Sequence, residues 1–162
     1  MNNRHATRRA GFTLVELIVV ILILGILSAL ALPKFINMGS DARTAKVQAI
    51  YGSVRAAAQI THAAAVVRNS LAATGTVSVD NTNITTAFGY PDITVATGIA
   101  FASGLDVTSS NSDQVTLDTT TTSGTMYIVP TGATTATTCR VAYTPAASAT
   151  VPPVIAVVTS GC

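Results

Sequence analysis

The chain has 162 residues, of which 49% are hydrophobic and 10% are charged, and its mean hydropathy is +0.52. This length allows one modest domain with an appendage, and so apolar a composition is unusual for a soluble cytosolic protein. The net charge of +2 is concentrated near the N-terminus, because after Asn69 the only basic residue is Arg140, against five aspartates. Nucleic-acid binding by the C-terminal part is therefore not expected.

Residues 12–32 form an apolar run that only four residues interrupt, namely Thr13, Glu16, Gly25 and Ser28. As a helix this run would be roughly 31 Å long, about the thickness of the hydrocarbon core of a bilayer, so we expect a membrane-spanning helix. Three arginines precede it: Arg4, Arg8 and Arg9. Since positive flanks stay on the cytoplasmic side, the rest of the chain should face the other side.

The carboxylate of Glu16 is out of place in this run. One alternative is a secretory signal peptide cut after the Ala-Leu-Ala at 29–31, but the run exceeds the usual length of about 7–15 residues and Pro33 follows the scissile pair. Another alternative is a plain membrane anchor, in which the charge costs a few kcal/mol or reaches the interface. Neither alternative gives the charge a use.

A partner for Glu16 arises if the chain is cut between Gly11 and Phe12. The new α-amino group of Phe12 then lies one helical turn from Glu16. On the same helix or a neighbouring one, this ammonium would neutralise the carboxylate in a setting of low dielectric constant.

Residues 33–70 have the pattern of an amphipathic helix rich in alanine. Its apolar positions recur in steps of three and four, at Val47, Ile50, Val54, Ala57, Ile60, Ala64, Val67 and Leu71. We expect one helix from Phe12 to about Ser70, bent or loosened at Pro33 and at Gly39-Ser40.

The composition changes after residue 70 to Thr, Ser, Gly and Val with frequent turn signals, which predicts a small antiparallel sheet packed on the apolar stripe of the helix. The fold class is therefore α+β. The predicted strands are Thr76–Asp80, Ile93–Ala96, Gln114–Asp118, Thr125–Val129, Arg140–Tyr143 and Val154–Thr159. The threonines at 119–122 are equally compatible with a flexible or a glycosylated stretch.

The two cysteines, Cys139 and Cys162, lie in the part that should be exported. An even count in an oxidising compartment predicts a disulfide between them, in preference to free thiols or an intermolecular bond. It would close a loop of about two dozen residues and stabilise the fold by about 3 kcal/mol in the chain-entropy model.

The stretch RRAGFTLVELIVVILILGILSALALPKF, residues 8–35, resembles the class III signal peptide of type IV pilins and of the pseudopilins of type II secretion. The shared pattern is a short basic leader ending in glycine, then Phe-Thr-Leu-Val-Glu-Leu, an apolar run and a proline. The resemblance extends weakly through Asp-Ala-Arg at 41–43, and beyond Ser70 only the general residue composition is similar.

The resemblance implies that a prepilin peptidase, a membrane aspartic protease, cuts after Gly11 and methylates the amino group of Phe12. It implies that Glu16 neutralises the Phe12 amine of a neighbouring subunit during assembly. The expected organisation is a leader at 1–11, a membrane and filament-core helix at 12–32, an amphipathic helix at 33–70 and a β-rich domain with a disulfide loop at 71–162. The precursor would lie in the bacterial inner membrane, with its N-terminus cytoplasmic and its C-terminal domain periplasmic, and would then join an extracellular filament.

The same N-terminal chemistry serves a pilus subunit and a secretion pseudopilin. Pilins of this kind commonly close their C-terminal region with a disulfide, whereas major pseudopilins usually use a calcium site, and Cys139 with Cys162 favours the pilin. Three residues are candidate calcium ligands, Asp106, Asp113 and Asp118, but their stretch lacks dense alternating oxygen ligands, and solvated aspartates are preferred. The pieces LPKFINM and DAR also resemble the mannose-sensitive haemagglutinin type of pilin.

An enzyme is the contrasting class. The sequence has two histidines, His5 in the leader and His62 on the helix, and no hydrolase, zinc-protease, Cys-x-x-Cys or phosphate-loop motif. Its four tyrosines are dispersed along the chain. We expect no catalytic residues, cofactor or metal, and take a membrane-tethered hydrolase as the remote alternative. The expected partners are other copies of the chain, the peptidase, the membrane and an inner-membrane assembly platform.

Overall fold

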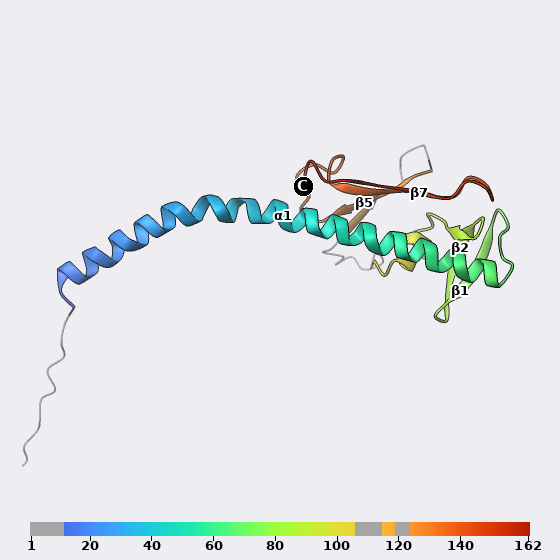
Figure 1. The fold of residues 1–162 in the computed structure, drawn as a ribbon, viewed down its shortest axis with the longest axis horizontal. Helices are drawn as coiled ribbons and strands as arrows, with labels where there is room; N and C mark the ends of the chain where they lie inside the picture. The colour runs from blue at the N-terminus through green and yellow to red at the C-terminus, as the bar shows by residue number, and fades with distance from the viewer. Residues whose placement is uncertain (1–11, 106–114, 119–123) are drawn as a thin grey trace, which may run out of the picture. The chain divides into compact units, whose positions relative to one another are not determined.

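The computed structural model describes residues 12–105, 115–118 and 124–162, apart from the side chains of residues 32–37. It has the predicted α+β arrangement, with one long N-terminal helix followed by two antiparallel sheets (Figure 1). The chain divides into two compact units, residues 1–39 and residues 40–162. The first contains the apolar part of the helix, and the second contains the rest of the helix and both sheets.

Helix α1 runs continuously from Leu14 to Val67. Backbone hydrogen bonds terminate the helix at its C-terminal end. The N–H of Ser70 donates to the carbonyl of Ala65 at 2.9 Å, the N–H of Asn69 donates to the carbonyl of Val66 at 3.1 Å, and Asn69 has φ of 52°. This is the Schellman arrangement, in which an asparagine takes the left-handed conformation that terminates a helix. The boundary between the two units falls between Gly39 and Ser40, and the bend expected at Pro33 and Gly39-Ser40 stays a prediction.

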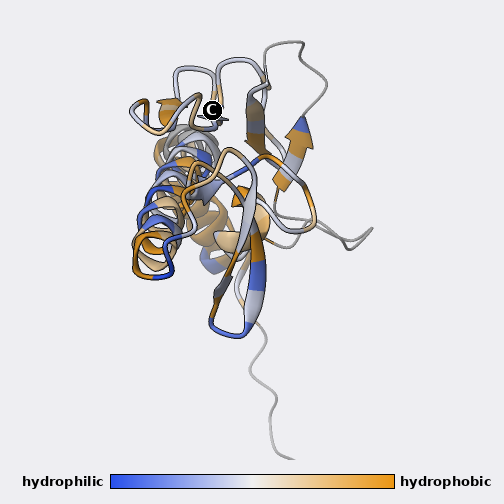
Figure 2. Cartoon of the chain, turned by 90° about the vertical axis from the view of Figure 1, so that its right-hand side faces the viewer, coloured by the Kyte–Doolittle hydropathy of each residue, from blue (hydrophilic) through white to orange (hydrophobic). Residues whose placement is uncertain are grey.

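The buried face of α1 differs from the predicted stripe in its second half. The first half is as predicted, since Val47, Ile50 and Val54 are buried, but Ile60 is 57% exposed and Val67 is 87% exposed. Successive residues of a helix are rotated by about 100°, so residue 60 points about 120° away from residue 54. The predicted positions 60, 64 and 67 therefore turn away from the face that Val47, Ile50 and Val54 define. The face against the sheets instead continues through buried Ala58, Thr61 and Ala65. In Figure 2 hydrophilic and hydrophobic stretches lie side by side on this part of the helix.

The first sheet has the order β1-β2-β3, with β1 at Gly75–Val79, β2 at Thr82–Ala87 and β3 at Tyr90–Pro91. Strand β1 was predicted, but β2 and β3 were not. Both connections are two-residue turns whose residues all have positive φ, Asp80-Asn81 and Phe88-Gly89. Such turns match the twist of a hairpin, and the sequence analysis missed them because neither dipeptide is the usual Asn-Gly or Asp-Gly.

The predicted strand Ile93–Ala96 is wrong, because these residues form bends and turns that lead into the short helix α2, Ile99–Ala102. The cause is Asp92. One of its carboxylate oxygens accepts the N–H of Thr94 at 2.9 Å, and the other accepts the hydroxyl of Thr94 at 2.9 Å. This local side-chain bonding favours a turn over a strand.

The second sheet has the order β4-β5-β6-β7 and all its pairings are antiparallel. Its strands are β4 at Val115–Asp118, β5 at Met126–Pro130, β6 at Arg140–Thr144 and β7 at Val154–Val158, which agree with four predicted segments. Alternate residues of β5 and β6 point into the core, and the buried ones include Ile128, Val141 and Tyr143. They pack with the buried face of α1 and with Ile99 and Ala100 of α2.

Three contacts tie these parts together. The phenol of Tyr143, on β6, donates a buried hydrogen bond of 2.6 Å to the carbonyl of Pro91, on β3, and so joins the two sheets. The predicted disulfide between Cys139 and Cys162 is present, with both cysteines buried. The guanidinium of Arg43, on α1, donates to the carbonyl of Cys162. The C-terminal segment is therefore fixed both to β6 and to the helix.

Candidate functional site

The first turn of α1 holds the carboxylate that the sequence analysis singled out. Thr13 precedes the helix, and its hydroxyl oxygen accepts the backbone N–H of Glu16 at 3.3 Å. In return, one oxygen of Glu16, Oε2, accepts the backbone N–H of Thr13 at 2.8 Å and its hydroxyl at 2.9 Å. These reciprocal bonds form a capping box, which satisfies N–H groups that a helix start leaves without partners.

The capping box gives Glu16 a partner within its own chain, which the sequence analysis did not consider. The signal was available, because Thr-x-x-Glu before an apolar run is the sequence pattern of a capping box. Thr13 is thus a functional residue that sequence reasoning missed. Within the described residues, both bonds fall on Oε2 and the other oxygen, Oε1, has no hydrogen-bond partner. The carboxylate is oriented by the cap and keeps one oxygen open.

Beyond the cap, the apolar side chains of the helix are exposed on every side. The window Leu14–Ala31 is long and apolar enough to cross a membrane, and none of it is buried. Its exposed large side chains include Leu14, Leu17, Ile21, Leu24 and Leu30, with Leu30 at 76%. Soluble monomers rarely expose a contiguous apolar surface of this size, so the surface needs lipid or other protein to cover it. Such a segment is an anchor, an assembly surface or both.

The predicted site residues are placed as follows. Gly11 lies outside the described residues, and Phe12, the residue after it, is 92% exposed. Phe12 and Glu16 lie together at the N-terminal end of α1, whereas Cys139 and Cys162 belong to the second unit. Of the candidate calcium ligands, Asp106 and Asp113 are also outside the described residues, and Asp118 ends β4. The threonine-rich stretch at 119–122 is outside them too.

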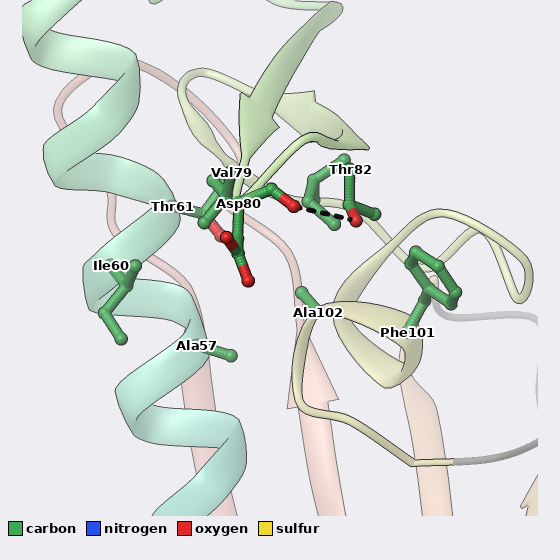
Figure 3. A pocket seen from close by; sticks show the side chains of 9 residues that line it. Ala57, Ile60, Thr61, Val79, Asp80, Thr82, Phe101 and Ala102 are labelled. Carbon is green, nitrogen blue, oxygen red and sulfur yellow. Dashed lines mark hydrogen bonds between the residues drawn. The ribbon is translucent and has the colours of Figure 1, made fainter.

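The second unit carries a hollow of about 260 Å³ between α1, the β1–β2 hairpin and α2 (Figure 3). Its lining is largely apolar, with Ala57, Ile60 and Phe101, and among the described residues that line it only Asp80 has a carboxylate. Among the described residues, no three His, Cys, Asp or Glu side chains come together as a metal site would require. His62 is stacked on Tyr90 and is not among the described residues that line this hollow.

The fold and the site define a class of protein with one long N-terminal helix. The N-terminal half of this helix is apolar and exposed, and its first turn carries a capping glutamate. The C-terminal half of the helix belongs to a small α+β domain. Residues 6–32 match the family of the prokaryotic N-terminal methylation motif. Over 50 residues the chain is 48% identical to the type IV narrow pilus major component PilA5 of Thermus thermophilus. No solved structure matches the chain significantly.

The similarity to PilA5 covers 31% of this chain and 43% of that protein, so the chain spans less than half of the length of this curated relative. The motif and this relative show that the N-terminal part of the chain is similar to type IV pilins, and the α+β arrangement is compatible with that similarity.

Proposed function

We propose that the chain is the precursor of a structural subunit of a type IV pilus, which polymerises through its N-terminal helix into a surface filament. The observation that carries this proposal is the methylation motif at residues 6–32 leading directly into a helix whose apolar surface is exposed throughout. Before assembly the helix anchors the precursor in the bacterial inner membrane, with the N-terminus cytoplasmic and the second unit periplasmic. Orientation follows from the arginines of the leader.

Processing creates the subunit's working N-terminus. In this proposal a prepilin peptidase cuts between Gly11 and Phe12 and methylates the new amino group. The high exposure of Phe12 and its position before the helix cap support access by a protease. The cut removes the basic leader, so the charge that held the N-terminus on the cytoplasmic side is lost and the helix can leave the membrane.

Glu16 then guides assembly. Its oxygen Oε2 is held by Thr13, and Oε1 is open to a donor from another chain. The ammonium of Phe12 on a neighbouring subunit can therefore bind without breaking the cap of the first helix. Inside the apolar filament core an unpaired carboxylate is costly, and pairing with this ammonium removes that cost. It also sets the register of the incoming subunit, as buried polar groups do in coiled coils.

Cohesion of the filament comes from the apolar half of α1. The side chains that are exposed in the single chain become buried between neighbouring helices, and each Å² of apolar surface contributes about 25 cal/mol. The second unit, with its sheets and disulfide, would face outward. The function in this proposal is structural rather than enzymatic, with no catalytic residues and no cofactor.

The test is to shear surface filaments from cells and measure the intact mass and N-terminal sequence of their protein. The expected result is a chain that starts at N-methylated Phe12 and is two hydrogens light for the disulfide. Processed protein found only in the inner membrane would favour a type II secretion pseudopilin. A start at Leu32 would contradict the proposal, since it would mark an ordinary signal peptide.

Two variants separate the steps. Glu16→Ala should abolish or sharply reduce incorporation into filaments while leaving leader cleavage intact, with Asp41→Ala as the control carboxylate outside the apolar run. Gly11→Leu should block processing, with Gly25→Ala as control, since a Cβ at Gly25 meets no atom within 4 Å. Normal filaments from Glu16→Ala would refute the pairing of Glu16, and a mature chain of unchanged mass from Gly11→Leu would refute the cleavage site.

A further inference from the structure

A second hollow, of about 270 Å³, lies where α1, β3 and the approach to β7 meet. It is lined by Tyr51, Arg55 and Gln59 from the helix, by Tyr90 from β3, and by Pro152 and Pro153 just before β7. These residues are far apart in the sequence, and the fold alone gathers them. The volume lies just below the usual range for small-molecule sites, about 300–1,000 Å³, which suits a ligand unit of one ring.

The aromatic side of the hollow is held in place. The ring of Tyr90 is stacked on the ring of His62, with centroids 3.9 Å apart and planes 2° from parallel. Tyr51 is half-buried and packs against the hydrophobic core. Two phenol rings and two prolines thus supply the wall of the hollow, and the ring of Tyr90 is held by its stack on His62. Aromatic faces carry partial negative charge and accept the weakly positive C–H groups of a sugar ring.

The polar side of the hollow is cationic. Arg55 is exposed, and within the described part of the chain its guanidinium has no ion-pair or hydrogen-bond partner. None of the described residues that line the hollow is acidic, whereas Gln59, one helical turn from Arg55, adds an amide that can both donate and accept. A planar guanidinium with free N–H groups is suited to a carboxylate, which it can bind through two parallel hydrogen bonds.

From this arrangement we propose that the hollow binds an acidic sugar unit, of the uronic-acid type, from a polysaccharide. The carboxylate pairs with Arg55, ring hydroxyls bond to the amide of Gln59 and to the phenols, and the C–H face of the sugar lies on the aromatic and proline wall. The tyrosines are dispersed in the sequence, and the fold brings two of them, Tyr51 and Tyr90, to this hollow. The site lies in the second unit and does not depend on the chemistry of Phe12 and Glu16.

The test measures binding of a fluorescently labelled oligomer of galacturonic acid to the full-length protein in detergent micelles, by fluorescence polarisation. The neutral galactose oligomer of equal length and linkage is the comparison probe. Wild type should bind the acidic oligomer at least tenfold more tightly than the neutral one. Arg55→Gln should weaken the acidic oligomer roughly ten- to a hundredfold, the range expected for a hydrogen bond to a charged group, and leave the neutral one unchanged.

The matched control is Lys46→Gln, which removes a cation from the same helix outside the hollow and should change binding less than twofold. Tyr51→Ala should weaken both oligomers, because it removes part of the wall. Equal binding of the two oligomers, no binding at millimolar concentration, or equal losses in Arg55→Gln and Lys46→Gln would each overturn the proposal. An unchanged circular-dichroism melt confirms that each variant folds.

Discussion

The hydroxyl of Tyr143 is the most informative single group to remove. It is fully buried and donates its hydrogen bond of 2.6 Å to the carbonyl of Pro91, so it joins the second sheet to the first. Tyr143→Phe keeps the ring and its packing but leaves the carbonyl of Pro91 buried without a donor. The penalty for such an orphaned group is about 1–3 kcal/mol of unfolding free energy.

The same group predicts how stability depends on pH. Burial raises the pKa of Tyr143, and the negative charge of Asp92 acts in the same direction. Below about pH 10, the usual pKa of tyrosine, the phenol is neutral in both the folded and the unfolded chain, and it adds no pH dependence. Above that pH the unfolded chain loses the proton first, so stability should fall by up to about 1.4 kcal/mol per pH unit.

The assay is thermal and urea unfolding of the full-length protein in detergent, followed by near-ultraviolet circular dichroism between pH 7 and 11. At pH 7, Tyr143→Phe should lower the unfolding free energy by about 1–3 kcal/mol, and each kcal/mol corresponds to roughly 2–8 °C in Tm. Above pH 10 the variant should lose stability less steeply than wild type. The control is Tyr127→Phe, on the outer side of β5. A Tyr143→Phe variant within about 0.5 kcal/mol of wild type would refute the reasoning.

Three further predictions concern the backbone, the disulfide and the helix cap. Gly89→Ala should lower the unfolding free energy more than Gly104→Ala. Both glycines have positive φ, 79° and 72°, which costs an alanine about 1–2 kcal/mol of backbone strain, but only at Gly89 does a Cβ also meet other side chains. Equal losses of unfolding free energy in urea would contradict this steric contribution at Gly89. Replacing Cys139 and Cys162 together by alanine should lower the unfolding free energy by about 3 kcal/mol, and wild type in reductant should match the variant. Thr13→Ala should weaken the cap by about 1 kcal/mol, seen as roughly fivefold faster amide exchange in the first turn of α1, whereas Thr13→Ser should exchange like wild type.

The N-terminal half was readable because its information is local. The run at 12–32 needs only composition and length to be identified, and the helix that follows needs only the 3.6-residue period. Even so, the predicted apolar stripe left the buried face of the helix between Val54 and Ile60, because apolar residues lie on more than one side of an alanine-rich helix. The buried face includes Thr61, a polar residue that no apolar pattern would have selected.

The sheet region was harder because its signals are short and ambiguous. The segments that became β5, β6 and β7 alternate clearly, but Ile93–Ala96 has the same β-branched composition and forms turns. What decided between the two outcomes was one side chain, Asp92, whose carboxylate bonds the backbone and hydroxyl of Thr94. Strand β2 was missed for the opposite reason, since its threonines look like loop residues until β1 supplies a partner.

The sequence by itself determined the membrane-length helix, its acidic first turn, the likeness of its leader to those of pilins and the pairing of the two cysteines, because each depends on residues close together or on a count of two. Only the tertiary structure decided that Tyr143 ties the two sheets and that Tyr51, Arg55 and Tyr90 share one hollow. Those contacts join side chains whose directions are fixed by the helix, the hairpin turns and the sheet register. The order of residues in the sequence does not specify these side-chain directions before the chain has folded.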